Sequence, residues 1–114
     1  MATIIQAGSG TGGISYSTEE TEIGTWIDGR KVYRRVFSKG SAGPVTGNHS
    51  ITQTVQDMDI LIDCNFIFYA DGRWEVNWTG TLNRYLEGNT LGIVLDSSPA
   101  YSSSYIIATY VKKK

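Results

Sequence analysis

Residues 78–85 bring together the side chains that a carbohydrate site uses, namely two aromatic rings with amide, hydroxyl and guanidinium groups. The apolar faces of sugars pack on aromatic rings, while Asn, Asp and Arg form hydrogen bonds with the sugar hydroxyls. The serine-rich residues 98–104 offer a further ring in Tyr101. The residue types therefore predict sugar contact at five positions: Trp78, Asn83, Arg84, Tyr85 and Tyr101.

Packing is the competing interpretation for the aromatic members of this set. Trp78 falls on an apolar strand face in the register favoured below, so it can be a core residue. Tyr85 has the size to fill a core position as well, and serine-rich loops commonly bind nothing. Both interpretations stay open at this point.

Catalytic chemistry has few candidates in this chain. The single histidine, His49, lies in a Gly/Asn/Ser-rich stretch with no cysteine or carboxylate at metal-ligand spacing, so we predict a surface loop and no metal site. Cys64 lies within the apolar run 60–69 and is expected to be a small buried hydrophobe. We predict no catalytic residues and no cofactor, because the chain also lacks nucleophile-elbow, phosphate-loop and zinc-protease motifs.

Asp59 and Asp63 are the one carboxylate pair that resembles a catalytic arrangement. Four residues apart in an extended strand, they are expected on one face, and glycosidases use two carboxylates about 5–10 Å apart. A β-protein with 11 acidic residues also produces such a pair by chance. The pair therefore does not change the prediction that the chain is not an enzyme.

Length and charge narrow the function classes further. The 114 residues make one domain, and the net charge of −1 comes without the basic stripe of a nucleic-acid binder. No apolar stretch approaches the ~20 residues of a membrane helix. Residues 1–6 lack the features of a signal peptide, which predicts synthesis in the cytoplasm.

The elements that must position these residues are predicted to be strands. Short β-branched and aromatic runs alternate with turn residues, and the chain contains 13 Gly, 7 Tyr and 3 Trp. Residues 1–13 are expected to form a short strand (2–7) and a glycine-rich linker, and residues 14–114 the β-domain. Residues 40–50 and 96–103 are expected to be loops. We predict an antiparallel β-sandwich of jelly-roll-like topology.

Two hairpins with Asp-Gly-Arg turns stand out in this pattern. In the second, a three-residue loop at 70–72 would place Phe68 opposite Trp74 and gather the large apolar side chains on one face. A two-residue loop would place Phe68 opposite Glu75 instead. We predict the three-residue loop. For the first hairpin, the same loop at 27–29 pairs Glu22 with Arg34, and an alternative register is almost as well sorted.

The last predicted strand, residues 104–111, carries bulky side chains on both faces. A second apolar face in so small a domain favours a subunit interface, and a central strand of the sandwich is the alternative. The expected interface residues come from this strand and from the first hairpin: Trp26, Tyr33, Tyr105, Ile107 and Tyr110.

Several segments resemble an appendage module of phages and prophages. Residues 16–20 read Tyr-Ser-Thr-Glu-Glu, and residues 23–30 read Ile-Gly-Thr-Trp-Ile-Asp-Gly-Arg. Together they resemble the YSTxE…GTWIDG opening of domains found on tail-fibre and baseplate proteins. The resemblance extends over residues 14–112 and includes the second Asp-Gly-Arg turn at 71–73.

The resemblance implies a virion protein that is made in the bacterial cytoplasm and carried on the phage tail. Members are usually oligomeric, commonly trimeric in fibres, and are thought to contact bacterial surface polysaccharide. The implied partners are further copies of the chain, other virion tail proteins and that polysaccharide. Attachment to host glycans is the expected function, and a non-binding capping, decoration or adaptor role is the alternative.

Overall fold

The computed structural model describes residues 16–114, so the strand and linker predicted within residues 1–13 lie outside the described residues. Eight strands follow one another in this region, and none of its residues forms a helix long and apolar enough to cross a membrane. The strands are β1 (Thr21–Thr25), β2 (Lys31–Ser38), β3 (Val45–Thr54), β4 (Met58–Ala70), β5 (Arg73–Glu75), β6 (Thr81–Glu87), β7 (Thr90–Ser98) and β8 (Ser103–Lys112).

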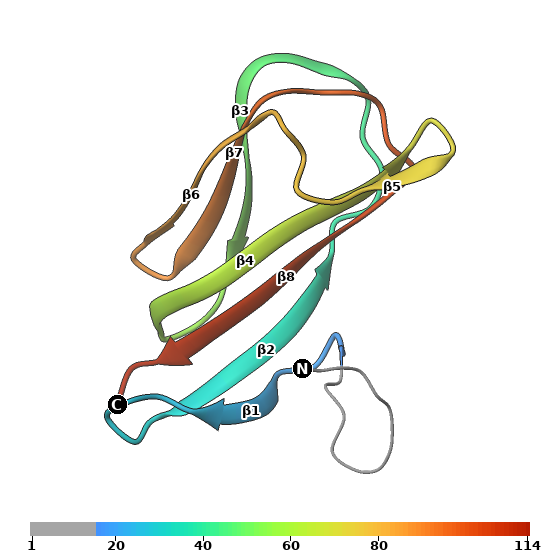
Figure 1. The fold of residues 1–114 in the computed structure, drawn as a ribbon. Coiled ribbons are helices and arrows are strands. Elements are labelled where there is room, and N and C mark those ends of the chain that lie inside the picture. The colour runs from blue at the N-terminus through green and yellow to red at the C-terminus, as the bar shows by residue number, and fades with distance from the viewer. Residues whose placement is uncertain (1–15) are drawn as a thin grey trace.

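The strands form two antiparallel sheets, which confirms the predicted β-sandwich (Figure 1). One sheet has the order β1-β2-β8-β4-β5 and the other has the order β3-β7-β6. The chain passes from one sheet to the other between β2 and β3 and again between β3 and β4. Strands distant in sequence are thereby paired, β2 with β8 and β3 with β7, as in a jelly roll.

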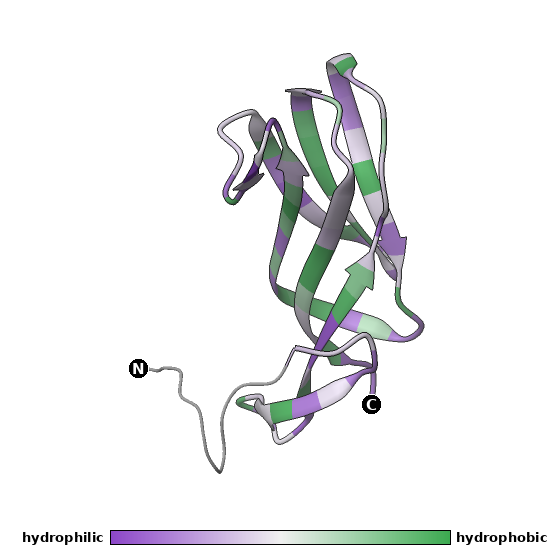
Figure 2. Cartoon of the chain, turned by 90° about the vertical axis from the view of Figure 1, so that its right-hand side faces the viewer, coloured by the Kyte–Doolittle hydropathy of each residue, from purple (hydrophilic) through white to green (hydrophobic). Residues whose placement is uncertain are grey.

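Strand β8 is the centre of the larger sheet, because it pairs with β2 along one edge and with β4 along the other. Its alternate side chains Ile106, Ala108 and Tyr110 face the smaller sheet and are fully buried. Leu91, Ile93 and Leu95 of β7 are buried with them in one core cluster. Figure 2 shows the alternation of apolar and polar residues along the strands of both layers.

The first hairpin closes with the three-residue loop at 27–29, one of the two arrangements that the sequence left open. The Trp26 backbone N–H donates to the Arg30 carbonyl at 2.7 Å, and Gly29 adopts a φ of 92°. Near the turn, Thr25 pairs with Lys31 as this loop requires. A bulge at Ile23 then shifts the register by one residue, so Glu22 faces Tyr33 rather than Arg34.

The second hairpin contradicts the predicted register. Ala70 pairs with Arg73 and Phe68 with Glu75, which leaves a two-residue loop of Asp71 and Gly72. Both loop residues have positive φ, 52° and 80°, which is the type I′ turn whose twist matches that of the flanking strands. The prediction assumed that the second strand continues to residue 78, but β5 ends at Glu75 and the chain then crosses to the other sheet.

The two segments predicted as loops, 40–50 and 96–103, contain strand, and so does the candidate sugar-contact segment 78–85. Residues 45–54 form β3, so His49 lies in a strand, where its Nε2 is 3.3 Å from the Ser98 hydroxyl. Residues 81–87 form β6, and residues 96–98 belong to β7. The polar residues of these segments are tolerated because β3 and β6 are the edge strands of the smaller sheet and keep one side in solvent.

Glu20 ties the segment before β1 to the central strand. Its carboxylate accepts hydrogen bonds from the Tyr110 hydroxyl at 2.7 Å and from the Lys112 ammonium at 2.9 Å. Partial burial opposes the ionisation of Glu20, but these two bonds and the Lys112 charge outweigh it and lower the pKa of the carboxyl below 4.5. The ionised carboxylate thus stabilises the fold.

Substitution of Gly72 by alanine is expected to destabilise the protein by about 1–2 kcal/mol, since an L side chain is strained at its φ of 80°. Chemical unfolding of the variant would measure this. Gly24 is the matched control, because it has no positive φ and a Cβ there would meet no atom within 4 Å. Equal stabilities of Gly72→Ala and Gly24→Ala would contradict the type I′ turn.

Acid is expected to remove the stabilisation that Glu20 supplies. Because the pKa of Glu20 is lower in the folded chain than in the unfolded chain, its contribution is complete above about pH 4.5 and is lost as the pH falls through the folded value. The melting temperature of wild type should therefore fall more steeply below pH 4.5 than that of Glu20→Gln. Glu87→Gln should keep the wild-type profile, and identical profiles for wild type and Glu20→Gln would contradict the expectation.

Candidate functional site

The outer face is the side of the five-stranded sheet that points away from the three-stranded sheet. The side chains of β8 that do not enter the core, Tyr105, Ile107 and Thr109, lie along its middle. Cross-strand pairing places Val36 beside Ile107 and Ile67 beside Tyr105. An apolar strip of half-buried side chains thus follows the sheet on the side opposite to the core, and toward the end of β8 this face becomes buried at Thr109 and Val111.

An aromatic cluster of Tyr69, Trp74 and Tyr105 lies at the β4–β5 end of this face. Tyr69 and Trp74 face each other across the hairpin, with ring centroids 5.4 Å apart and an edge-to-face geometry. The Trp74 and Tyr105 rings are 6.1 Å apart and inclined by only 29°. Trp74 is 46% exposed and Tyr69 is 36% exposed, so the cluster presents ring surface to solvent.

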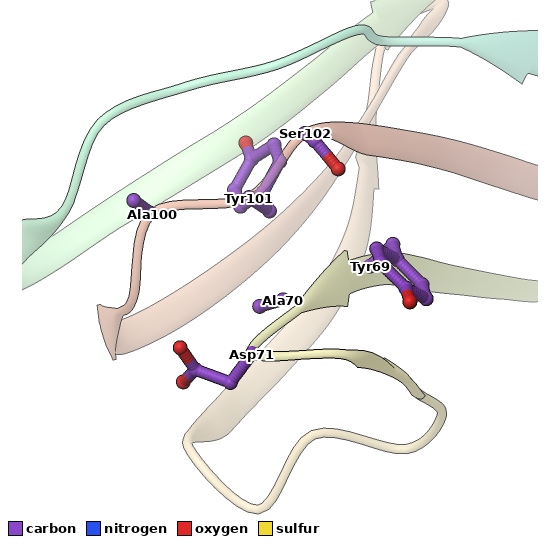
Figure 3. Close-up of a pocket in the computed structure, with 6 residues that line it drawn as sticks. All are labelled: Tyr69, Ala70, Asp71, Ala100, Tyr101 and Ser102. Carbon is purple, nitrogen blue, oxygen red and sulfur yellow. The ribbon is translucent and has the colours of Figure 1, made fainter.

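A pocket of about 350 Å³ adjoins the aromatic cluster and shares Tyr69 with it. Two neighbouring segments line it, residues 69–71 at the end of β4 and residues 100–102 before β8 (Figure 3). A hydrogen bond of 3.0 Å from the Ser102 backbone N–H to the Tyr69 carbonyl holds these segments together. The pocket is therefore built on the frame of the sheet.

The pocket combines an apolar floor with polar groups at its rim. Tyr101 is buried against Phe66 and Phe68, and this burial raises the pKa of its phenol. The Asp71 carboxylate and the Ser102 hydroxyl lie on the two exposed lining segments. A hydroxyl-rich ligand lying on the aromatic cluster would find an acceptor and a donor here.

Two of the five predicted sugar-contact residues serve the core. The Trp78 ring packs edge-on against Phe68, with centroids 5.5 Å apart, and its indole N–H donates to the Ser97 carbonyl at 3.0 Å. Tyr101 is only 8% exposed, so it contributes to the pocket floor rather than a free ring. For these two residues the packing interpretation describes the observed contacts.

The other three predicted contact residues lie on β6, in the three-stranded sheet. Tyr85 is opposite Gly92 of β7, and its ring occupies the space where a Cβ of residue 92 would lie. Asn83 and Arg84 are exposed on this strand. They are on a different sheet from the aromatic cluster, so the structure does not join the predicted residues into one site, and sugar contact by Asn83 and Arg84 stays a prediction.

The predicted interface residues fall into three groups. Tyr110 is fully buried within the single chain and cannot be an interface residue, because it faces the core; Tyr33 packs beside it at 6.1 Å. Trp26 is half-buried at the turn of the first hairpin. Tyr105 and Ile107 lie half-buried on the outer face, and their interface role stays a prediction. β8 is also the central strand of its sheet, as the alternative interpretation required.

The acidic pair of the sequence does not form a common site. Irregularities at residues 58–60 and 61–63 interrupt the regular alternation of β4 on which the prediction relied. Asp59 accepts from the Arg30 guanidinium at 2.8 Å, whereas Asp63 pairs across to Thr109 on the outer face. Within residues 16–114, no three His, Cys, Asp or Glu side chains converge as metal ligands would.

Sequence reasoning missed Tyr69 and Trp74 as exposed residues, because the predicted register put Trp74 opposite Phe68 on the core side. The Asp-Gly dipeptide was the available signal, since it favours a two-residue type I′ turn. Applied to residues 71–72, that rule places Trp74 beside Tyr69 and away from Phe68.

A scan of family models, a search of curated proteins and a search of solved structures each found no match to this chain.

Replacement of Gly92 by alanine is expected to destabilise the protein by about 1–3 kcal/mol, because the new Cβ would overlap the Tyr85 ring. Combining Gly92→Ala with Tyr85→Ala removes the overlap, so the double variant should lose less stability than the sum of the single variants. Chemical unfolding of the four proteins gives the coupling. Additive losses would contradict the structural role assigned to Tyr85.

Proposed function

We propose that this chain is an appendage domain of a phage virion that attaches to bacterial surface glycans through the aromatic cluster of Tyr69, Trp74 and Tyr105. The observation that carries the glycan part is the exposure of the Tyr69 and Trp74 rings, which neighbour the half-buried ring of Tyr105 on the sheet. The resemblance of residues 16–30 to tail-fibre and baseplate modules supports the virion part.

The geometry of the cluster suits a sugar chain lying across the sheet. The Trp74 ring stacks on the Tyr105 ring, only 29° from parallel, and Trp74 is still 46% exposed, so ring surface that Tyr105 does not cover is open to a pyranose face. The Tyr69 backbone carbonyl accepts a hydrogen bond from the Ser102 backbone N–H, and β5 is held in place by its pairing with β4. Rings held in this way lose little conformational entropy when a ligand binds.

Polar groups for the sugar hydroxyls lie beside the cluster. Asp71 and Ser102 belong to the pocket next to Tyr69. Arg73 and Glu75 bind each other at 2.9 Å on the opposite face of β5 from Trp74, so they do not belong to this site. A shallow site of this kind binds one chain weakly, about millimolar, and becomes effective when several copies act together.

A capping or decoration role is the second candidate, and Val36 and Ile107 favour it. These half-buried aliphatic residues extend the apolar strip of the outer face beyond the aromatic cluster, toward the far end of β8. Aliphatic side chains add little to sugar stacking and are typical of protein contacts. Both roles would use one face of the same sheet.

Replacing Trp74 by alanine is expected to weaken glycan binding at least ~10-fold, which corresponds to a loss of about 1.4 kcal/mol of ring contact. The measurement is an array of purified bacterial envelope polysaccharides, followed by titration of those that bind. Trp74→Phe should retain most of the affinity, because it keeps an aromatic face at the same position.

Asn83→Ala and Arg84→Ala are the matched controls, since they change exposed polar residues of β6 on the other sheet. Both should bind like wild type. If these variants lose binding and Trp74→Ala keeps it, the site lies on β6. If folded wild-type protein binds no glycan on the array, attachment to glycans is wrong and the capping role takes its place.

A further inference from the structure

We propose that the outer face pairs with the same face of a second copy of this chain about a two-fold axis that runs along β8, with Arg34 of each copy opposite Asp63 of the other. The inference concerns assembly and does not depend on glycan binding. It rests on a row of three side chains, on an arginine without acceptors and on the outline of the sheet.

The charged row consists of Arg34 on β2, Thr109 on β8 and Asp63 on β4. Thr109 pairs directly with Arg34 on one side and with Asp63 on the other. Adjacent strands are about 4.8 Å apart, so the positive and negative groups lie at equal distances on opposite sides of β8. The row thus places opposite charges symmetrically about the central strand of the outer face.

Arg34 lacks hydrogen-bond acceptors for part of its guanidinium. Among residues 16–114, its Nε and Nη1 atoms have no hydrogen-bond partner although both are shielded from solvent, and the Tyr16 ring stacks 5.2 Å from the guanidinium carbon. The chain itself shields these two atoms, so a carboxylate of a second copy would approach the half-buried side chain as an opposite charge and not through them.

Asp63 is the complementary group on the other side of β8. It belongs to an exposed part of β4, and among the described residues its carboxylate meets only the Asn65 amide, at 3.5 Å. This distance is at the limit of a hydrogen bond, so the carboxylate retains most of its capacity to accept. A bidentate guanidinium is the partner that best satisfies it.

A two-fold axis parallel to β8 brings these groups together. A rotation of 180° about this axis exchanges the β2 side and the β4 side of β8 and leaves each residue at the same position along the strand direction. Arg34 of one copy therefore lies over Asp63 of the other, and the contact occurs twice. Thr109 is only 8% exposed in the single chain and lies below this contact, and the half-buried aliphatic residues Val36 and Ile107 are enclosed between the sheets. An axis across the strands would instead oppose Arg34 to Arg34.

The outline of the sheet leaves the aromatic cluster at the rim of this contact. Strand β2 ends at Ser38, opposite Tyr105, whereas β4 continues past that level to Ala70. After the rotation, β2 of the partner covers the β4 side only up to Tyr105. Tyr69 and Trp74 extend beyond it, whereas Tyr105 lies at its edge, so the paired assembly leaves two of the three rings of the cluster free.

Charge reversal tests the pairing. Sedimentation of the wild-type chain over a range of concentrations should show a monomer–dimer equilibrium. Arg34→Glu and Asp63→Arg should each weaken it at least ~10-fold, since each places like charges opposite one another at two symmetric contacts. The double variant Arg34→Glu/Asp63→Arg restores opposite charges and should return the dissociation constant to within about threefold of wild type.

Arg84→Glu is the control, because it makes the same change of charge on the other sheet and should leave dimerisation unaffected. Thermal unfolding verifies that each variant is folded. Where a charge-reversal variant does not fold, the neutral variant at the same position, Arg34→Gln or Asp63→Asn, takes its place. A wild-type monomer at every concentration overturns the proposal. A trimer, or a dimer whose dissociation constant neither charge reversal changes, also overturns it. None of these results bears on the binding of glycans by Trp74.

Discussion

The pairing of β8 on both of its edges is the constraint on which the rest of the structure depends. Because β2 and β4 are hydrogen-bonded to the same strand, the alternation of β8 fixes which side chains of all three strands face the core. Tyr110 and Ile106 enter the core and Tyr105 and Ile107 face outward. The two apolar faces of this one strand thereby create both the sandwich core and the outer face.

The type I′ turn at residues 71–72 decides what the outer face can do. Side chains alternate with a period of two, so a one-residue slip in the β4–β5 hairpin would move Trp74 to the core side and Glu75 to the outer side. The observed register instead stacks Trp74 beside Tyr105 and leaves its ring accessible. A local backbone preference of Asp-Gly therefore places the most exposed aromatic ring of the candidate site.

The outer face divides into regions of different chemistry. Exposed rings and a pocket with polar rim groups lie at the β4–β5 end, and they suit a polar ligand with apolar faces. Toward the other end, aliphatic residues adjoin Arg34 and Asp63, a combination more typical of contact between protein surfaces. Attachment and assembly can then share one sheet, and repetition of a weak site would raise its avidity.

The sequence by itself determined the all-β class, the sandwich and most strand positions, because these follow from local periodicity and turn residues, and it left the register of the first hairpin open. It did not determine that residues 45–54 and 81–87 are strands, since polar edge strands resemble loops. Only the tertiary structure decided the roles of Trp78, Tyr101 and Tyr110, which pack in the core, and of Trp74, which does not. Burial of an aromatic ring depends on partners distant in the chain, and these are fixed by strand pairing rather than by local residue type.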